Sequence, residues 1–320
     1  MRGDAVSVRA FVDEHYRHFN AGTLQRAARS LTEFIDAGGK VFLTLAGAMS
    51  TAELGRSLAP MIRAGHVAAI SCTGANLEED LFNLVAHDHY VRIHSHEDLA
   101  PADDQALLER HLNRVTDTCI PEEEAIRAVE HHMMARWRSA PEPQLPHRFL
   151  YDLVLSGDLH DVYQANPADS WLLAAAELAL PLYVPGWEDS TLGNIFAARS
   201  MEGEVKTDAV LGGVHYMHHL VDFYQRNHHP LAFLQVGGGI AGDFPICVVP
   251  LLTQDLQVEA PLWSWFAQVT DATASYGGYS GAPPNEKISW GKLSIDTPRF
   301  NIHSDATVVM PLLFGYVLDR

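Results

Sequence analysis

A strand, a turn of small residues and a helix follow one another twice near the start of this chain. The first unit predicts a strand over residues 40–45 and a helix that Thr51 caps and that ends near Ala64. The second predicts a strand over residues 66–72 and a helix over residues 77–86. Repeated units of this kind are typical of a parallel sheet with helices on its faces. The sequence therefore predicts an α/β fold.

Later segments extend this pattern. Three more runs read as strands, over residues 181–184, 231–236 and 264–269. Each precedes a loop rich in Gly, Asp, Ser or Thr, over residues 186–194, 237–243 and 271–281. Ligands of open α/β sheets bind at the carboxyl edge of the strands, so we expect these loops to build the functional site.

The remaining segments read as helices. Residues 1–39 carry apolar side chains at helical spacing and predict an N-terminal helical extension. Residues 101–178 look mostly helical, with Pro121 at the start of one helix. No linker is evident after the extension, so residues 40–320 are expected to form a single catalytic domain.

Composition excludes several classes of partner. The formal net charge of −18 argues against nucleic acid, since phosphate binding needs clustered Lys and Arg. No apolar run reaches the ~18–20 residues that span a bilayer, and no basic start leads into the apolar run of a signal peptide. We therefore expect no membrane partner and a cytoplasmic location.

Cysteine and histidine do not predict a metal site. Cys72, Cys119 and Cys247 lack metal-ligand spacing, and a reducing cytoplasm is their simplest setting. Histidines cluster within residues 87–96 and 215–219, and an HxH pair can bind zinc. The chain has no HExxH motif, however, so surface or core histidines are the default expectation.

Lys292 is one of only four lysines, and it follows Trp290 and a loop rich in Gly and Pro. Arginine, which supplies most of the positive charge, cannot act as an amine nucleophile. A lysine beside an apolar wall loses its proton more easily, and its neutral amine can form an imine. The alternative is a charged residue at the end of a strand.

Residues near Lys292 could bind an amine. Glu286 lies six residues upstream, and its carboxylate could hold the ammonium end of a polyamine. Four aromatic residues, in this region and in one earlier loop, could offer ring faces for cation–π contacts with the same ligand. The alternative is that they belong to the core. These aromatic residues are Trp187, Tyr276, Tyr279 and Trp290.

Three further motifs could hold a nucleotide. Gly237–Gly239 follows a strand and is expected either to open a helix that favours phosphate or to make a tight turn. Residues 73–76 offer a similar cradle, after which Glu78 and Glu79 could hold ribose hydroxyls or cap a helix. Asp305 could cap the C-terminal helix or bind a sugar.

Taken together, the motifs resemble the deoxyhypusine synthase family, and most closely its bacterial deoxyhypusine synthase-like branch. The resemblance runs from about Lys40 to the C-terminus. Six separated motifs carry it in order: Phe42–Leu43, Thr73–Leu81, Asp189–Gly193, Gly237–Gly239, Ser289–Lys292 and Ser304–Ala306.

The resemblance implies a Rossmann-like NAD-binding fold and a homotetramer with active sites at subunit interfaces. It also implies that NAD⁺ takes a hydride from the carbon beside a secondary amine of a polyamine. Lys292 then captures the imine, a diamine leaves, a second amine displaces the lysine, and NADH reduces the new imine.

The resemblance also assigns residues. Its cofactor-binding positions are Thr73, Gly74, Glu79, Asp189, Gly238, Asp305 and Ala306. Its substrate-site positions, around the catalytic Lys292, include Glu286 and Trp290.

Four positions of the implied site depart from the eukaryotic members. Those members have aspartates where this chain has Asn194 and Tyr279, a histidine at Asp243 and an asparagine at Cys247. A charged hydrogen bond contributes about 1.5–3 kcal/mol, so losing two carboxylates should change which amine fits. The Asp243 carboxylate could replace the histidine as proton acceptor.

The expected function is therefore an NAD-dependent aminoalkyl transferase that acts on polyamines or a related amine such as agmatine. A small amine acceptor, giving a homospermidine-like product, is favoured over a protein lysine. The alternatives are a deoxyhypusine synthase that modifies a protein lysine, or a catalytically idle NAD- or polyamine-binding module.

Overall fold

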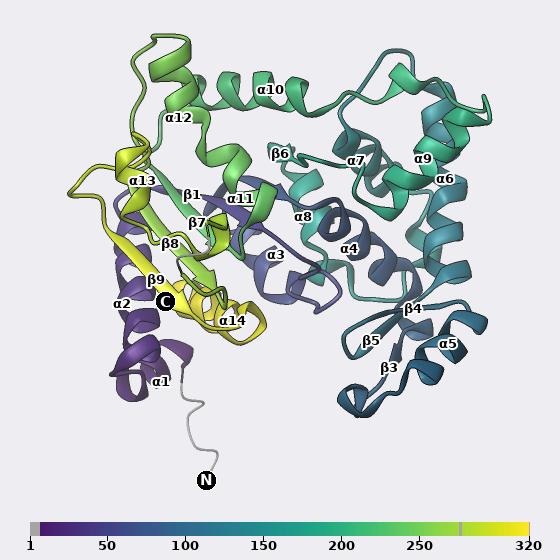
Figure 1. Ribbon diagram of the computed structural model, residues 1–320, viewed down its shortest axis with the longest axis horizontal. Helices are drawn as coiled ribbons and strands as arrows, with labels where there is room; N and C mark the ends of the chain where they lie inside the picture. Colours follow the sequence, from purple (N-terminus) through teal and green to yellow (C-terminus); the bar gives the residue numbers. More distant parts are fainter. Residues whose placement is uncertain (1–6, 275–276, 320) are drawn as a thin grey trace.

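The computed structural model describes residues 7–274 and 277–319 and centres on a six-stranded sheet (Figure 1). The strand order is β6-β2-β1-β7-β8-β9, and all paired neighbours are parallel. The strands are β1 (Lys40–Leu45), β2 (Val67–Cys72), β6 (Leu182–Tyr183), β7 (Leu231–Val236), β8 (Trp265–Thr270) and β9 (Arg299–His303). The predicted α/β fold with a parallel sheet flanked by helices is confirmed, although β9 was not predicted.

The order of the strands reverses between β1 and β7. From β1 the chain continues through β2 to β6 on one side, whereas β7, β8 and β9 lie on the other side. Loops that leave such a switch point diverge and open a crevice for ligands. The loops after β1 and β7 are close together here, because a Cβ added to Gly237 would lie 2.8 Å from Cβ of Ala46.

One face of the sheet is covered by α2 (Phe19–Asp36) and α14 (Ala306–Leu318), with α1 (Val8–His15) packed on α14. The contact is largely apolar, and Trp265 of β8 adds a hydrogen bond from Nε1 to Oγ of Ser30 (3.0 Å). The two N-terminal helices therefore contribute directly to the core of the sheet.

The opposite face carries an aromatic stack. Phe42, Phe233 and Phe266 are in register on β1, β7 and β8, with ring centroids 5.8 and 6.0 Å apart and nearly parallel planes. The helices on this side are α10 (Gly213–Arg226), α11 (Gly239–Ile246) and α12 (Val248–Pro250).

A row of polar side chains crosses the same face, two residues closer to the carboxyl ends of the strands. In register along β2, β1, β7, β8 and β9, its members are Ser71, Thr44, Gln235, Gln268 and Asn301. Each has a buried side-chain oxygen with no hydrogen-bond partner among the described residues. An unpaired buried polar group costs about 1–3 kcal/mol. These oxygens are therefore better suited to contact a polar ligand than to pack in an apolar core.

A second, antiparallel sheet lies at the lower right of Figure 1. It consists of β3 (Val91–Arg92), β5 (Thr118–Pro121) and β4 (Leu112–Val115), beside α5 (Pro101–Glu109). The expectation that residues 101–178 are mostly helical missed this hairpin. Its strands are only four residues long, and its turn places Thr116 at a positive φ of 56°, which few side chains adopt.

The other helices surround the two sheets. They are α3 (Gly55–Arg63), α4 (Gly74–Ala86), α6 (Ala128–Ser139), α7 (Pro146–Ser156), α8 (Trp171–Glu177), α9 (Thr191–Met201) and α13 (Glu286–Ser289). No helix in the described part of the chain is long and apolar enough to cross a membrane.

Two predicted helix starts were wrong. The helix α3 begins at Gly55 behind Leu54, and the hydroxyl of Thr51 donates to Oε2 of Glu79 (2.5 Å) instead of capping α3. The helix α4 begins at Gly74, so Thr73 is its cap and not part of a longer turn.

Asp80 joins α4 to α8 and allows a direct test of this packing. Its carboxylate accepts hydrogen bonds from Oγ of Ser170 (2.5 Å) and from the N–H of Leu172 (3.1 Å), and burial raises the pKa of Asp80 to about 6. Asp80→Ala is expected to lower the free energy of unfolding in urea by about 2–3 kcal/mol, because buried donors lose their acceptor. The exposed control Asp98→Ala should change it by about 0.5 kcal/mol or less. Equal effects of the two substitutions would contradict this role.

Candidate active site

Lys292 is held in a turn directly after α13, the short helix labelled in Figure 1. Its N–H donates to the carbonyl of Lys287 (3.0 Å), and its own carbonyl accepts from the N–H of Trp263 (3.2 Å). Gly291 makes the turn with a φ of +66°, which favours glycine. As a result Lys292 is only 6% exposed, although Trp290 beside it is 65% exposed.

The amine of Lys292 lies beside a carboxylate. Its Nζ is 3.6 Å from Oδ1 of Asp243 in α11, which also accepts a weak hydrogen bond from Sγ of Cys247 (3.7 Å). The centroids of the Trp290 and Tyr279 rings lie 5.7 and 6.0 Å from the same Nζ. The structure thus brings four predicted site residues together, Asp243 from α11 and the other three from residues 279–292.

This lysine centre lies over a face of the sheet and not at its edge. Trp263, which holds the backbone of Lys292, precedes β8, whereas Asp243 lies in the middle of α11. Nζ of Lys287 lies 5.7 Å from the Phe266 ring centroid, and Gly242 of α11 packs against Gln235. The segment 279–292 and α11 therefore cover the face that carries the aromatic stack and the polar row. The expectation that the site lies at the carboxyl edge applies to the loops but not to the lysine itself.

Lys287 is a second buried lysine that sequence reasoning missed. It is 3% exposed, and its Nζ donates to the carbonyl of Ala282 (3.0 Å) and lies 4.8 Å from the Tyr279 ring centroid. Burial, together with the positive charge of Lys292, lowers the pKa of Lys287 to about 8. Its position in a lysine-poor chain, five residues before Lys292, was the available signal.

Two other predicted substrate residues lie farther out. Glu286 is exposed on α13, and its charge acts on Lys287 by favouring the ammonium form. Asn194 lies on α9, where its Nδ2 donates to the carbonyls of Glu188 (3.0 Å) and Ser190 (2.7 Å). The aromatic residue Tyr276 lies outside the described residues.

Residues 73–76 after β2, which were predicted to cradle a phosphate, cap α4 and pack it against α9. The hydroxyl of Thr73 donates to the carbonyl of Gly47 (2.7 Å) and accepts from the N–H of Asn76 (3.1 Å). A Cβ added to Gly74 would lie 2.5 Å from Cβ of Ser190, so only glycine fits there. Asp189, next to that serine, is exposed.

Glu78 and Glu79, which follow in α4, make different contacts. Glu78 accepts from the N–H groups of Thr191 and Leu192, both at 2.8 Å, and so caps α9. Burial raises the pKa of Glu78 to about 7 and also raises the pKa of Glu79. The carboxylate of Glu79 is buried against Thr51, which leaves acceptor positions that a ligand hydroxyl could use.

The glycine run after β7 opens α11 at Gly239, as predicted, and joins this loop to the lysine segment. Gly237 and Gly239 have positive φ values of 73° and 60°. A Cβ added to Gly238 would lie 2.6 Å from Cα of Ser280. This glycine is therefore needed for the close approach of the segment that carries Tyr279.

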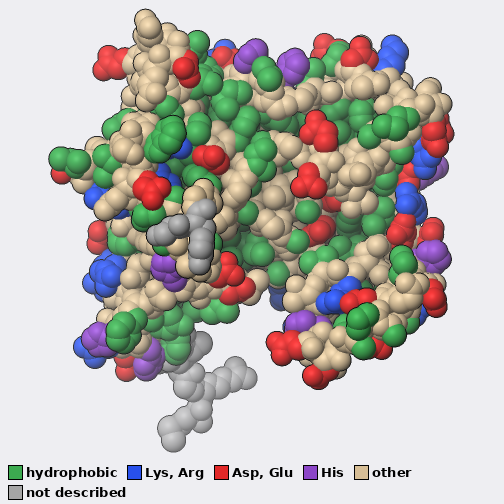
Figure 2. Space-filling view, viewed as in Figure 1, with side chains coloured by type: hydrophobic (Ala, Val, Ile, Leu, Met, Phe, Trp, Pro, Cys, Tyr) green, Lys and Arg blue, Asp and Glu red, His purple; other side chains and the backbone are tan. Residues whose placement is uncertain are grey.

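A cavity of about 750 Å³ separates the small antiparallel sheet from the carboxyl edge of the large one. Figure 2 shows this face hollowed between the small-sheet lobe and the region of α14. Thr51, Tyr90, Asp305 and Thr307 are among the residues that line it. The Tyr90 hydroxyl is buried with no partner in the described part of the chain. Asp305 caps α14 at Ala306, its first residue, by accepting from the N–H of Thr307 (2.7 Å).

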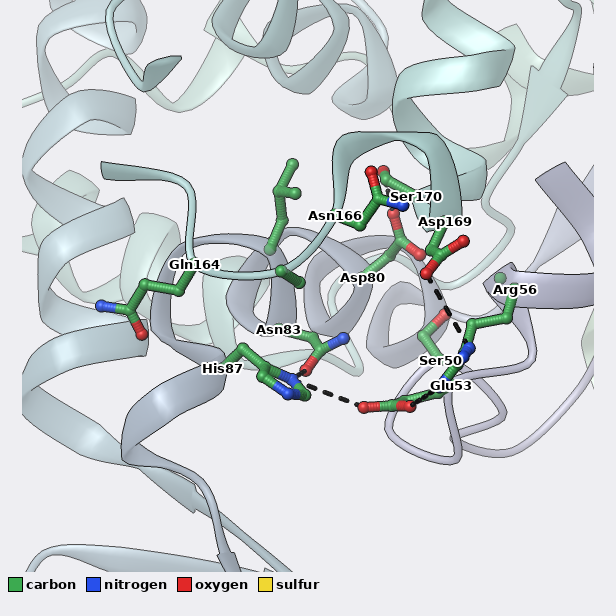
Figure 3. Close-up of a pocket in the computed structure, with 13 residues that line it drawn as sticks. Ser50, Glu53, Arg56, Asp80, Asn83, His87, Gln164, Asn166, Asp169 and Ser170 are labelled. Carbon is green, nitrogen blue, oxygen red and sulfur yellow. Dashed lines mark hydrogen bonds and ion pairs between the residues drawn. The ribbon is translucent and has the colours of Figure 1, made fainter. Parts of the chain in front are cut away.

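A smaller pocket of about 180 Å³ adjoins this cavity and shares Glu53, Asn83 and His87 with it. Figure 3 shows that its charged side chains face one another. Nδ1 of His87 lies 3.4 Å from Oε1 of Glu53, and Nε of Arg56 lies 3.8 Å from Oδ2 of Asp169. The pocket is thus polar but internally paired, and Lys292 lines neither cavity.

No group of three or more His, Cys, Asp and Glu residues could hold a metal ion within residues 7–274 and 277–319. The histidines near residue 87 pair with acids instead, since His89 lies 3.8 Å from Glu124.

The parallel sheet flanked by helices defines an α/β protein, and the nearly buried lysine beside a carboxylate is its candidate active site. Comparison with known proteins gives the family. The model of the deoxyhypusine synthase family matches residues 13–317, so the chain belongs to the deoxyhypusine synthase family. Membership of this family indicates a transferase with a role in aminobutyl transfer.

Individual relatives agree with this assignment. The chain is 28% identical to a "Deoxyhypusine synthase-like protein" of Cyanothece sp. strain PCC 7425, over 99% of this chain and 80% of the relative. It is also 28% identical to "Probable deoxyhypusine synthase 1" of Archaeoglobus fulgidus, over 94% and 90% of the two chains. A candidate deoxyhypusine synthase structure from Entamoeba histolytica shares the fold, with a TM-score of 0.58 and 11% identity over 98% of this chain and 93% of that one.

Gly238→Ala tests the close approach of the two loops. The added methyl group would overlap Ser280, and overpacking of this kind should lower the free energy of unfolding by about 1–3 kcal/mol. Gly278→Ala, two residues before Ser280 in the facing segment, is the control, because a Cβ there meets nothing within 4 Å and its φ is −75°. Chemical denaturation that finds the two variants equally stable would contradict the packing described.

The pH dependence of stability tests the burial of Lys287. Because its pKa is about 8 in the folded protein and about 10.4 in an unfolded chain, the unfolded state binds more protons between these values. The stability of the wild type relative to Lys287→Met should therefore rise as pH increases from 8 to 10. Urea titrations at several pH values measure this difference, with exposed Lys206→Met as background; a pH-independent difference would contradict the burial.

Proposed function

We propose that this protein is an NAD-dependent aminoalkyl transferase in which Lys292 carries the transferred group as an imine. The observation that supports this most strongly is the amine of Lys292, which is nearly buried and lies 3.6 Å from a carboxylate. A lysine used only for surface charge has no need of this burial. Family membership supports the same class of reaction.

Asp243 is proposed as the proton acceptor of this site. An ammonium group must lose a proton before its nitrogen can attack carbon, and Oδ1 of Asp243 lies within reach of Nζ. The carboxylate is half exposed, so it can pass the proton on to solvent. Burial of the lysine meanwhile limits the access of water that would hydrolyse an imine.

The proposed amine-binding residues are Trp290 and Tyr279, whose rings lie beside Lys292, together with Glu286 and Asn194 farther out. The rings of Trp290 and Tyr279 can contact a substrate cation, and the Glu286 carboxylate can accept hydrogen bonds from its ammonium group. Asn194 is proposed to offer an amide contact in place of a carboxylate. A small amine is the proposed acceptor, because the confined position of Lys292 suits a slender substrate better than a protein surface.

The proposed cofactor is NAD, which when bound supplies hydride transfer at the carbon beside the amine. The cavity of about 750 Å³ lies within the roughly 300–1,000 Å³ range of ligand sites. The Tyr90 hydroxyl, which lines the cavity and has no partner among the described residues, offers a donor to ribose hydroxyls. The buried Glu79 carboxylate, whose partner Thr51 lines the cavity, offers an acceptor. Of the residues proposed to hold the cofactor, Asp305 lines this cavity. The others are Thr73, Gly74, Glu79, Asp189, Gly238 and Ala306, which are outside its lining.

A homotetramer with active sites at subunit interfaces is proposed as the assembly. Large apolar side chains remain exposed near the lysine centre, among them Trp290, Ile240 and Ile295. Exposed apolar residues that lie together mark protein–protein contacts. A second subunit that covers them would also narrow the open side of the amine site.

Lys292→Arg tests the covalent step directly. The protein is incubated with NAD⁺ and putrescine, spermidine or agmatine, treated with borohydride and weighed intact by mass spectrometry. The wild type should gain the mass of an aminoalkyl group, whereas Lys292→Arg should gain none, because guanidinium does not form the imine.

Lys206→Arg, which changes an exposed lysine, is the control and should be labelled like the wild type. Absence of an adduct on the wild type with every amine would support an idle binding module instead. An adduct that persists in Lys292→Arg would refute the assignment of the nucleophile.

A further inference from the structure

We propose that Lys287 selects the amine substrate by charge, so that the site favours an amine that carries a carboxylate over the same amine without one. This inference rests on the proposed function, because it names the substrate class of the Lys292 site. It makes Lys287 a specificity-determining residue and assigns it no bond-making role.

The ammonium group of Lys287 is buried without a full set of acceptors. Its Nζ has three N–H donors, and the carbonyl of Ala282 is the one oxygen acceptor that the described residues supply. Its other close neighbours are the aromatic rings of Tyr279 at 4.8 Å and Phe266 at 5.7 Å. A buried cation with unused donors is costly, and a carboxylate is the group that best satisfies it.

The two lysines share one aromatic ring. The Nζ atoms of Lys287 and Lys292 lie 4.8 and 6.0 Å from the centroid of Tyr279. The charged groups that act on Lys287 are Lys292 on its own segment and two carboxylates, Glu286 on α13 and Asp243 on α11. Two cations thus face two anions, and no net negative charge remains to attract a substrate with several ammonium groups.

Hydrogen-bonding groups near Tyr279 include both donors and acceptors. The Tyr279 hydroxyl is buried and has no partner in the described ranges, and the same holds for Oε1 of Gln235 and of Gln268. Tyr279 and Gln235 both pack against Gly242: a Cβ added there would lie 3.0 Å from Cε1 of Tyr279 and 3.3 Å from Cδ of Gln235. Gln268 donates to the Ala282 carbonyl that Lys287 also uses (3.3 Å).

These groups match the two ends of an amino-acid head. A carboxylate can accept from Lys287 and from the Tyr279 hydroxyl, and an α-ammonium group can donate to the two glutamine oxygens. A plain diamine would use the acceptors alone and would meet the charge of Lys287 uncompensated. The chemistry therefore points to a diamino acid or a similar carboxylated amine.

Matched amine pairs test the proposal. Ornithine and putrescine differ only by the carboxylate, as do arginine and agmatine. When Lys292 captures the oxidised donor, ammonia leaves from the first pair and guanidine from the second. The rate of borohydride-trapped labelling with NAD⁺ is measured over a range of amine concentrations for the wild type and Lys287→Met. The wild type should favour the carboxylated member about tenfold, the effect of one charged hydrogen bond, mainly through a lower KM.

Lys287→Met should abolish this preference and speed the labelling by putrescine, whereas Lys287→Arg, which keeps the charge, should retain the preference. Calorimetric binding of the same pairs without NAD⁺ gives a second readout that needs no chemistry. Labelling of the wild type by the diamines alone, unchanged in Lys287→Met, would overturn the proposal and leave the proposed function intact. No labelling by any amine, including spermidine, would overturn the proposed function. In that case the calorimetric measurement still tests this inference, and equal affinity for both members of each pair would overturn it.

Discussion

The contact between Lys292 and Asp243 ties the functional part of this molecule together. It joins the turn after α13 to the middle of α11, two segments that are 49 positions apart in the numbering of the chain. A buried ammonium group is costly unless a carboxylate or other acceptor accompanies it. The contact therefore explains how a nearly buried lysine is tolerated over an apolar sheet, and it places a proton acceptor where a nucleophilic amine needs one.

The sheet prepares this position in two layers. In-register phenylalanines on β1, β7 and β8 make a flat apolar base, and the polar row follows two residues later on the same strands. The segment 279–292 can pack on these phenylalanines only because Gly238 has no side chain, which lets Ser280 come close to the glycine loop. Substrate chemistry and the loop at the switch point between β1 and β7 are thus linked by one close backbone contact.

Local sequence patterns predicted a large part of this arrangement. Short runs rich in β-forming residues predicted β1 and β7 with the correct bounds, and the scarcity of lysine drew attention to Lys292. Signals that depend on distant partners were missed. The hairpin β4–β5 is short, and Thr51 donates a hydrogen bond to Glu79 of α4. Lys287 becomes buried only when Tyr279 and Phe266 pack against it.

Locating the covalent bond within the chain tests the central claim most directly. The protein is treated with NAD⁺, spermidine and borohydride, digested, and its peptides are sequenced by mass spectrometry. The account predicts one aminobutyl group on Nζ of Lys292, with Lys287 in the same region unmodified. Modification of Lys287 in place of Lys292, or of both in equal amounts, would contradict the view that the carboxylate of Asp243 singles out one of two neighbouring amines.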